Sequence, residues 1–356
     1  MTSRNPAGNV WQFKARFRRG AFGWRSQPAV QRVKEAVREI KKAARRDPVL
    51  AADGAVAFLE RISPALENVD SSSGSIATAV NNAIAELVPI IAGADVDRRT
   101  RERWLEHLWA AHEDDQIPYI EALGEHWGDL CALREVASRW ADELLSSTRL
   151  ALSQDRSVRG FFQGTTACLS ALLAAERYHD ILDVLEHERF WHYRVWAVRA
   201  LAALGRTSEA LQMAESSRGP YASDRWIDAE CERILLSSGQ AEEAYERYGL
   251  SANLAGTYLA TFRATARKYP RRAPEEILND LVATTPGEEG KWFAAAKELG
   301  FLPGGARTRH HVSMRSEDAH ASRGRVRDRE PGLRARGWSP RPPLVAERVW
   351  IRDHGS

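Results

Sequence analysis

Apolar residues recur with the period of an α-helix along most of the chain. Between residues 28 and 48, Val30, Val33, Val37 and Ile40 follow one another at spacings of three and four, which places them on one helix face. The opposite face is basic, and a proline stands at each end of the segment. Comparable patterns occupy segments 49–62, 75–94, 99–114 and 130–152. No segment alternates strictly between apolar and polar residues, so the pattern predicts an all-α fold of helices joined by short loops.

A turn motif recurs at a spacing of 34 residues. Gly205 and Gly239 occupy equivalent positions, and each is followed four residues later by Glu-Ala. An upstream copy has Glu176 at the glycine position, 29 residues before Gly205. A flexible residue can end the first helix of a pair, and alanine in the second helix lets the two helices approach closely. The motif therefore predicts consecutive pairs of antiparallel helices.

These features resemble tetratricopeptide (TPR) repeats, whose usual period is about 34 residues. The resemblance covers residues 165–270 and departs from the family where Arg194 replaces a large aromatic. It implies an α-solenoid of antiparallel helix pairs, a TPR-like superhelix. Other stretches are similar to bacterial helical-repeat proteins, some of which carry SWIM-type zinc fingers. The Cys-x-Cys and Cys-x-His pairs of that finger are absent here, so no zinc is expected.

Composition divides the chain into four segments. We predict a basic aromatic N-terminal arm (1–27), an irregular helical-repeat region (28–164), a TPR-like repeat region (165–303) and an Arg-rich tail (304–356). The tail holds 12 arginines and no lysine. Two interpretations stay open for it, a disordered basic tail and the product of a frameshift in a GC-rich gene.

Charge is distributed unevenly along the chain. Residues 1–46 carry 13 basic and 2 acidic residues, whereas residues 47–303 carry 26 basic and 40 acidic residues. The basic arm interleaves cations with aromatic residues, and its candidate binding residues are Lys14, Arg16, Arg18, Arg19, Trp24 and Arg25. The sequence leaves three alternatives for what the arm binds. They are the acidic body of this chain or of a second copy, nucleic acid through residues 11–46, and a membrane surface or another acidic partner.

Residues 34 apart align in stacked repeats, which singles out two pairs. His192 aligns with Trp226, and Arg199 aligns with Arg233. In TPR arrays the first helix of each repeat lines the concave groove, so the resemblance implies that these four residues face it. Two stacked cations suit a carboxylate or an acidic peptide. The alternative is a solvated face with packing aromatics.

The sequence gives only weak evidence for a metal site or a catalytic site. His107 and His112 lie about 140° apart on a helix, which does not suit a shared metal ion. Cys131, Cys168 and Cys231 are far apart and lack metal-ligand spacing, so we expect buried thiols in a reducing compartment. The chain start lacks the apolar core of a signal peptide, and no integral membrane segment is expected.

Together these features favour a non-catalytic protein–protein interaction scaffold or adaptor in the bacterial cytoplasm, without cofactor or metal. The alternative is a nucleic-acid-associated protein that uses the basic arm. An enzyme with a dispersed site is a third hypothesis.

Overall fold

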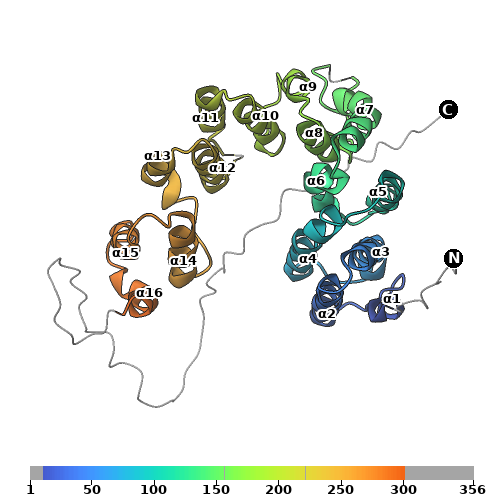
Figure 1. The fold of residues 1–356 in the computed structure, drawn as a ribbon, viewed down its shortest axis with the longest axis horizontal. Coiled ribbons are helices and arrows are strands. Elements are labelled where there is room, and N and C mark those ends of the chain that lie inside the picture. The colour runs from blue at the N-terminus through green and yellow to red at the C-terminus, as the bar shows by residue number, and fades with distance from the viewer. Residues whose placement is uncertain (1–10, 156, 221, 301–356) are drawn as a thin grey trace, which may run out of the picture. The chain divides into compact units, whose positions relative to one another are not determined.

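The computed structural model describes residues 11–155, 157–220 and 222–300. These residues form 16 α-helices with short 3₁₀ and π turns and contain no β-strand, so the all-α prediction is confirmed (Figure 1). The predicted tail (304–356) and the first ten residues of the arm lie outside the described residues.

The described residues divide into two units by their contacts. The first unit comprises residues 11–148 and 161–175, and the second comprises the remaining described residues from 149 onward. The turn at Glu176 begins the main part of the second unit, whereas the predicted repeat region begins at residue 165.

The first unit is built mainly from three long helices that pack on one another. Helices α2, α3 and α4 make mutual contacts, α5 lies on α3, and α6 contacts both α4 and α8. The helices of this unit are α1 (Gln12–Arg16), α2 (Ser26–Ala44), α3 (Pro48–Leu66), α4 (Ser75–Ala92), α5 (Arg98–Glu113), η1 (Glu121–His126), α6 (Trp127–Cys131), α7 (Arg134–Ala151, whose last turn belongs to the second unit) and α8 (Thr165–Ala174).

Side-chain caps explain where two of these helices begin. Asp47 precedes α3 and accepts a hydrogen bond from the Leu50 amide at 2.9 Å. Asp97 precedes α5 and accepts one from the Thr100 amide at 2.7 Å. Each carboxylate satisfies an amide that has no partner within its own helix. The amide hydrogen bond is also the main reason why the pKa of Asp97 is lowered.

Helix α4 is the one described helix that is long and apolar enough to cross a membrane, by length and composition alone. On one face of the helix, Ile76, Val80, Ile84 and Leu87 are fully buried. The helix packs between its neighbours α2 and α3. It therefore serves as a core helix of the first unit.

Three tryptophans form a second core region in the first unit. The ring of Trp109 lies 5.5 Å from that of Trp127 and 5.6 Å from that of Trp140, and the latter two are 5.1 Å apart. Trp127 and Trp140 are almost fully buried. Edge-to-face arrangements of this kind add stabilisation beyond the buried area.

The second unit is a series of shorter helices in which each packs mainly on the next. Its elements are α9 (Tyr178–Val184), α10 (Trp191–Ala203), α11 (Thr207–Glu215), α12 (Asp224–Ser237), α13 (Ala241–Ala244), η2 (Tyr245–Gly249), α14 (Tyr258–Lys268), α15 (Pro274–Ala283), η3 (Glu289–Trp292) and α16 (Phe293–Glu298). Buried Val198, Ile227, Cys231, Ile234 and Tyr245 belong to one continuous core.

The recurrent turn has the same backbone conformation in all three copies. Gly205 and Gly239 have φ angles of +76° and +77°, and Glu176 has +58°. The amide after each glycine donates to the carbonyl five residues before it, at 2.9 Å in both turns. This is the hydrogen-bond pattern of a helix that ends on a left-handed residue, which explains the glycine preference. Glutamate adopts the same conformation in the upstream copy at a steric cost.

Candidate partner-binding face

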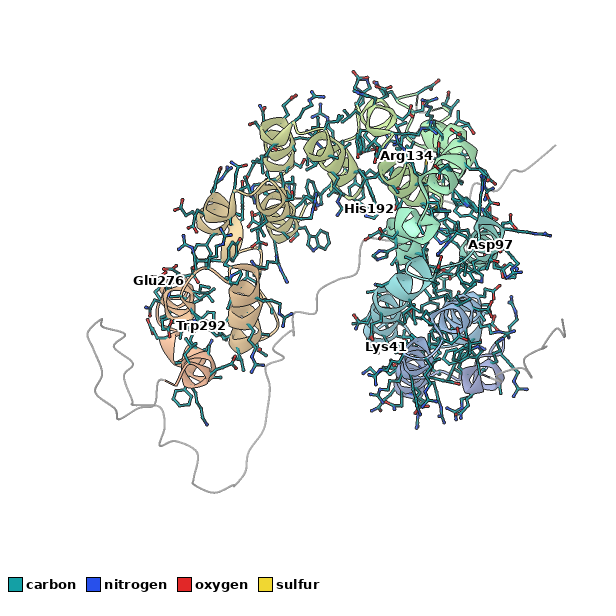
Figure 2. All side chains as sticks on the ribbon, in the orientation of Figure 1. Lys41, Asp97, Arg134, His192, Glu276 and Trp292 are labelled. Carbon is teal, nitrogen blue, oxygen red and sulfur yellow. The ribbon has the colours of Figure 1, made fainter. Side chains whose placement is uncertain are left out.

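Helices α10 and α12 carry the four residues that the repeat spacing singled out. Helix α10 begins after Phe190, where the Glu188 carboxylate accepts hydrogen bonds from the Arg189 and Phe190 amides, both at 2.8 Å. Its buried Trp191 and Trp196 anchor it in the unit. These anchors leave the side chains of His192 and Arg199 only partly buried, and Figure 2 labels His192 on α10.

Arg199 and Arg233 are brought together by a carboxylate that the repeat spacing did not reveal. Arg199 Nε lies 3.3 Å from Glu230 Oε1, and Arg233 Nε donates to the same oxygen at 3.1 Å. The Glu230 side chain is only 7% exposed. The two arginines were expected to receive an acidic group from a partner, and the chain itself already supplies one. Two cations on one anion leave this group with a net charge of +1.

The ionisation of Glu230 reflects two opposing effects. Burial alone would raise the pKa of this carboxyl. The hydrogen bonds from Arg233 and Arg199, together with their charges, outweigh burial and hold the pKa below its usual value. Glu230 is therefore a carboxylate at neutral pH. The Arg199 guanidinium also lies 4.9 Å from the centre of the Trp196 ring, which fixes it from a second side.

Aromatic residues lie on the same two helices. His192 contacts Phe190 and Tyr193, with ring centres 6.1 Å and 5.1 Å apart. Trp226 lies two turns before Arg233 on α12 and is 56% exposed. Tryptophan is enriched at protein interfaces, where its ring packs and its N–H finds a hydrogen-bond acceptor.

Helix α12 is fixed by three buried acids, each paired with a cation. Asp228 meets Arg218 from the preceding loop, Glu230 meets Arg199 from α10, and Glu232 meets Lys268 from α14. Glu232 is fully buried and also accepts a hydrogen bond from the Tyr269 hydroxyl at 2.7 Å. Burial, and then this hydrogen bond, raise the pKa of Tyr269.

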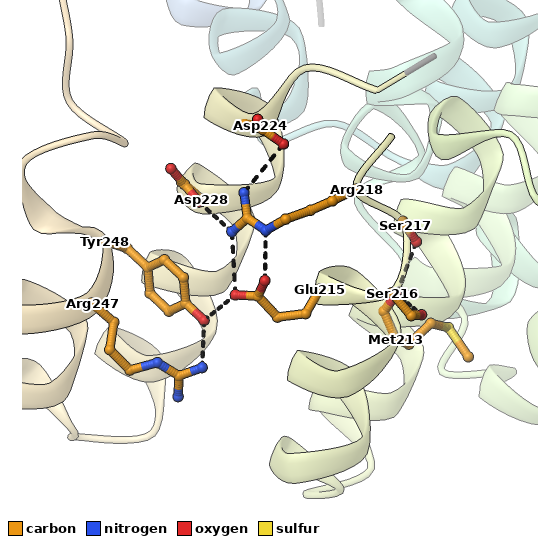
Figure 3. A network of polar contacts seen from close by, with 9 residues as sticks. All are labelled: Met213, Glu215, Ser216, Ser217, Arg218, Asp224, Asp228, Arg247 and Tyr248. Atoms are coloured by element: carbon orange, nitrogen blue, oxygen red, sulfur yellow. Dashed lines mark hydrogen bonds and ion pairs between the residues drawn. The ribbon is translucent and has the colours of Figure 1, made fainter. Parts of the chain in front are cut away.

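A network around Glu215 joins α11 to the elements that follow it (Figure 3). Arg218 Nε donates to Glu215 Oε2 at 2.6 Å, and the Tyr248 hydroxyl donates to Glu215 Oε1 at 2.5 Å. Arg247 in turn donates to the Tyr248 hydroxyl at 2.7 Å. The hydrogen bond from Arg218 is the main reason why the pKa of Glu215 is lowered. Glu215 therefore links α11 to the loop before α12, through Arg218, and to η2, through Tyr248.

The sequence analysis missed Glu230, the buried carboxylate that both arginines contact. Glu230 could have been found from its position three residues before Arg233, where ion pairs form along a helix.

The basic arm packs on the first unit. Trp11, Phe13 and Phe17 are at most 3% exposed, and the rings of Phe13 and Phe17 lie 5.4 Å and 5.0 Å from that of Phe58 on α3. The Trp11 indole fills the space above Gly54, where a Cβ atom would come within 2.4 Å of the ring. Within the first unit, the arm therefore contacts the body of its own chain.

Some cations of the arm form ion pairs with acids of the first unit, and others are exposed to solvent. Arg16 pairs with Glu35 at 3.0 Å, and Arg19 pairs with both Glu67 and Asp114, at 3.3 Å and 3.4 Å. Arg18 Nε donates to the Ala15 carbonyl, whereas Lys14 is half-buried. Trp24 and Arg25 are exposed. The aromatics that would have stacked on nucleic-acid bases are therefore largely buried, with Trp24 as the main exception.

The residues considered for metal or nucleophile chemistry have separate environments. His107 Nδ1 lies 2.8 Å from Glu60, whereas His112 is buried beside Gln163. Burial lowers the pKa of His112. The three cysteines are buried thiols outside any disulfide, and burial raises the pKa of the Cys131 thiol to about 12. In the described ranges, no group of three metal-ligating side chains comes together.

Comparisons with protein-family models, with curated proteins and with solved structures gave no significant match to this chain.

Proposed function

We propose that the chain is a TPR-like α-solenoid that acts as a non-catalytic scaffold or adaptor. Left-handed residues at Glu176, Gly205 and Gly239 separate consecutive helices, and sequential helices contact one another, as a solenoid requires. The three buried thiols suit the reducing conditions of a cytoplasm.

The partner-binding face consists of His192, Arg199, Trp226 and Arg233, with Glu230 beneath them. One observation carries this proposal: an exposed tryptophan lies on α12 two turns before Arg233, and a buried carboxylate already holds Arg233 and Arg199 in place. Tryptophan and arginine dominate the binding energy of protein interfaces. Because the arginines are fixed beforehand, little side-chain entropy is lost when a partner binds.

The charge of the face indicates the kind of partner. The two arginines and Glu230 carry a net charge of +1. A peptide or helix that presents an acidic residue beside an apolar one would match this arrangement. The apolar residue would pack on Trp226.

The proposal is tested by affinity capture from nuclease-treated native lysate, with the full chain as bait. We expect Trp226→Ala to reduce recovery of a discrete protein partner at least about tenfold, which is the usual size of a hot-spot effect. The matched control is Trp24→Ala, because Trp24 is 73% exposed but belongs to the first unit. Equal recovery with wild type and Trp226→Ala would contradict the proposed face.

A further inference from the structure

Helix α2 carries a row of exposed cations on one face. Lys34, Arg38, Lys41 and Arg45 fall within about 60° of one another around the helix axis, and Lys42 lies about 40° beyond. The five residues, here called the α2 stripe, extend over about 16 Å. All five are exposed.

The packing of α2 leaves this stripe facing solvent. Buried Val33, Val37 and Ile40 are centred about 100° around the helix axis from the stripe, on the side where the helix contacts α3 and α4. The two acids of α2 interact with groups outside the stripe. Glu35 pairs with Arg16 and Arg32, and Glu39 accepts a hydrogen bond from the Gln12 amide.

Most of the charge on the α2 stripe is therefore uncompensated. Lys41 meets Glu86 of α4 at 2.6 Å. Within the described ranges, Lys34, Arg38, Lys42 and Arg45 form no ion pair. The C-terminal helix dipole favours cations in the last turn, but it does not explain Lys34 and Arg38 in the middle of the helix.

An exposed indole stands at the start of the same helix. Trp24 is 73% exposed, and it lies two residues before α2. Its backbone is fixed, because its carbonyl accepts a hydrogen bond from the Asp70 amide at 2.9 Å. The docked arm buries its other large aromatics at Trp11, Phe13 and Phe17 but leaves this one accessible.

We propose that the α2 stripe and Trp24 form a binding surface for single-stranded nucleic acid. The row of cations follows a phosphate backbone, and the exposed indole stacks on an unpaired base. A membrane surface is the poorer match because the apolar face of α2, which would enter the lipid, is already buried in the core. This surface lies in the first unit and does not depend on the proposed partner-binding face in the second.

The test measures binding of the full chain to a fluorescent oligonucleotide of about 20 unpaired nucleotides, by anisotropy at several salt concentrations. The variant Lys34→Gln/Arg38→Gln/Arg45→Gln removes three cations of the stripe. We expect its affinity to fall at least about tenfold at low salt, and the slope of log affinity against log salt to decrease in magnitude by about 2.

A matched control removes the same number of charges from other surfaces of the first unit. Arg61, Arg99 and Arg103 are exposed on α3 and α5, and their replacement by glutamine changes the net charge equally. We expect this control to keep the wild-type salt slope. Trp24→Ala should weaken binding of the single strand about fivefold or more and leave binding of a duplex of the same length unchanged.

Three outcomes would overturn the proposal. One is equal loss of affinity in the stripe variant and its control, which would reflect net charge alone. Another is tighter binding to the duplex than to the single strand. The third is stripe-dependent binding to vesicles rich in phosphatidylserine without binding to the oligonucleotide, which would identify a membrane surface.

Discussion

The contact between Trp11 and Gly54 gives the sharpest prediction about the docked arm. Gly54 lies inside α3, where alanine is ordinarily favoured over glycine by about 1 kcal/mol. At this position a Cβ atom would come within 2.4 Å and 2.6 Å of two atoms of the Trp11 ring. The ring cannot move aside easily, because it is 3% exposed and stacks on Phe13.

The magnitudes decide which effect prevails. Loss of a buried tryptophan side chain costs about 3 to 5 kcal/mol. After the gain of about 1 kcal/mol in helix propensity, Gly54→Ala should therefore destabilise the first unit by about 2 to 4 kcal/mol if the Trp11 ring is expelled. In a Trp11→Ala background the clash is absent, and Gly54→Ala should instead stabilise α3 by about 1 kcal/mol.

The assay is hydrogen exchange, which gives the free energy of opening of α3. It is applied to the wild type, to Gly54→Ala, to Trp11→Ala and to the double variant. Peptide resolution is needed because the two units need not unfold together. A change of sign between the two backgrounds would establish that Trp11 occupies the space above Gly54. The same sign and size in both backgrounds would refute the docking of the arm.

Three further predictions address other parts of the structure. Burial raises the pKa of Asp115 to about 6, so the folded protein binds a proton at this carboxyl more readily than the unfolded protein does. Relative to Asp115→Asn, the wild type should therefore lose up to about 3 kcal/mol of stability as the pH rises from about 4 to 7. Parallel pH profiles of the two proteins in hydrogen exchange would contradict this. Arg233→Gln leaves a buried carboxylate with one cation fewer and should cost about 1 to 3 kcal/mol in urea denaturation, whereas Arg267→Gln, an exposed substitution on α14, should change stability by less than about 0.5 kcal/mol. Because both turn positions have positive φ, Glu176→Gly should raise thermal stability and Gly239→Ala should lower it, each by about 1 kcal/mol, and equal effects of the same sign would mean that the turns are not equivalent.

The sequence predicted the local features of this chain well. Helical periodicity predicted α2 with its buried Val33, Val37 and Ile40, and the spacing of 34 residues predicted the turns at Gly205 and Gly239. These features depend on residues that are near one another in the chain, or on a repeated unit, so a single sequence carries them.

Contacts between distant segments were harder to predict. Arg199 and Glu230 are 31 residues apart, and their ion pair depends on how α10 packs on α12. The charge asymmetry allowed docking on the acidic body, where Arg19 pairs with Glu67, but it gave no sign of Glu35, which lies in the basic segment itself. Nothing in the pattern showed that Gly54 makes room for an indole from the arm.

Site-specific photo-crosslinking in cells at position 226 probes the proposed partner-binding face directly. A photoreactive amino acid would replace Trp226 in the full chain, and a second variant of the same chain would carry it in place of Trp24. We expect a discrete crosslinked protein from position 226 that is absent from position 24 and persists after nuclease treatment. The same products from both positions, or no crosslinked protein from position 226, would contradict a partner-binding face on α10 and α12.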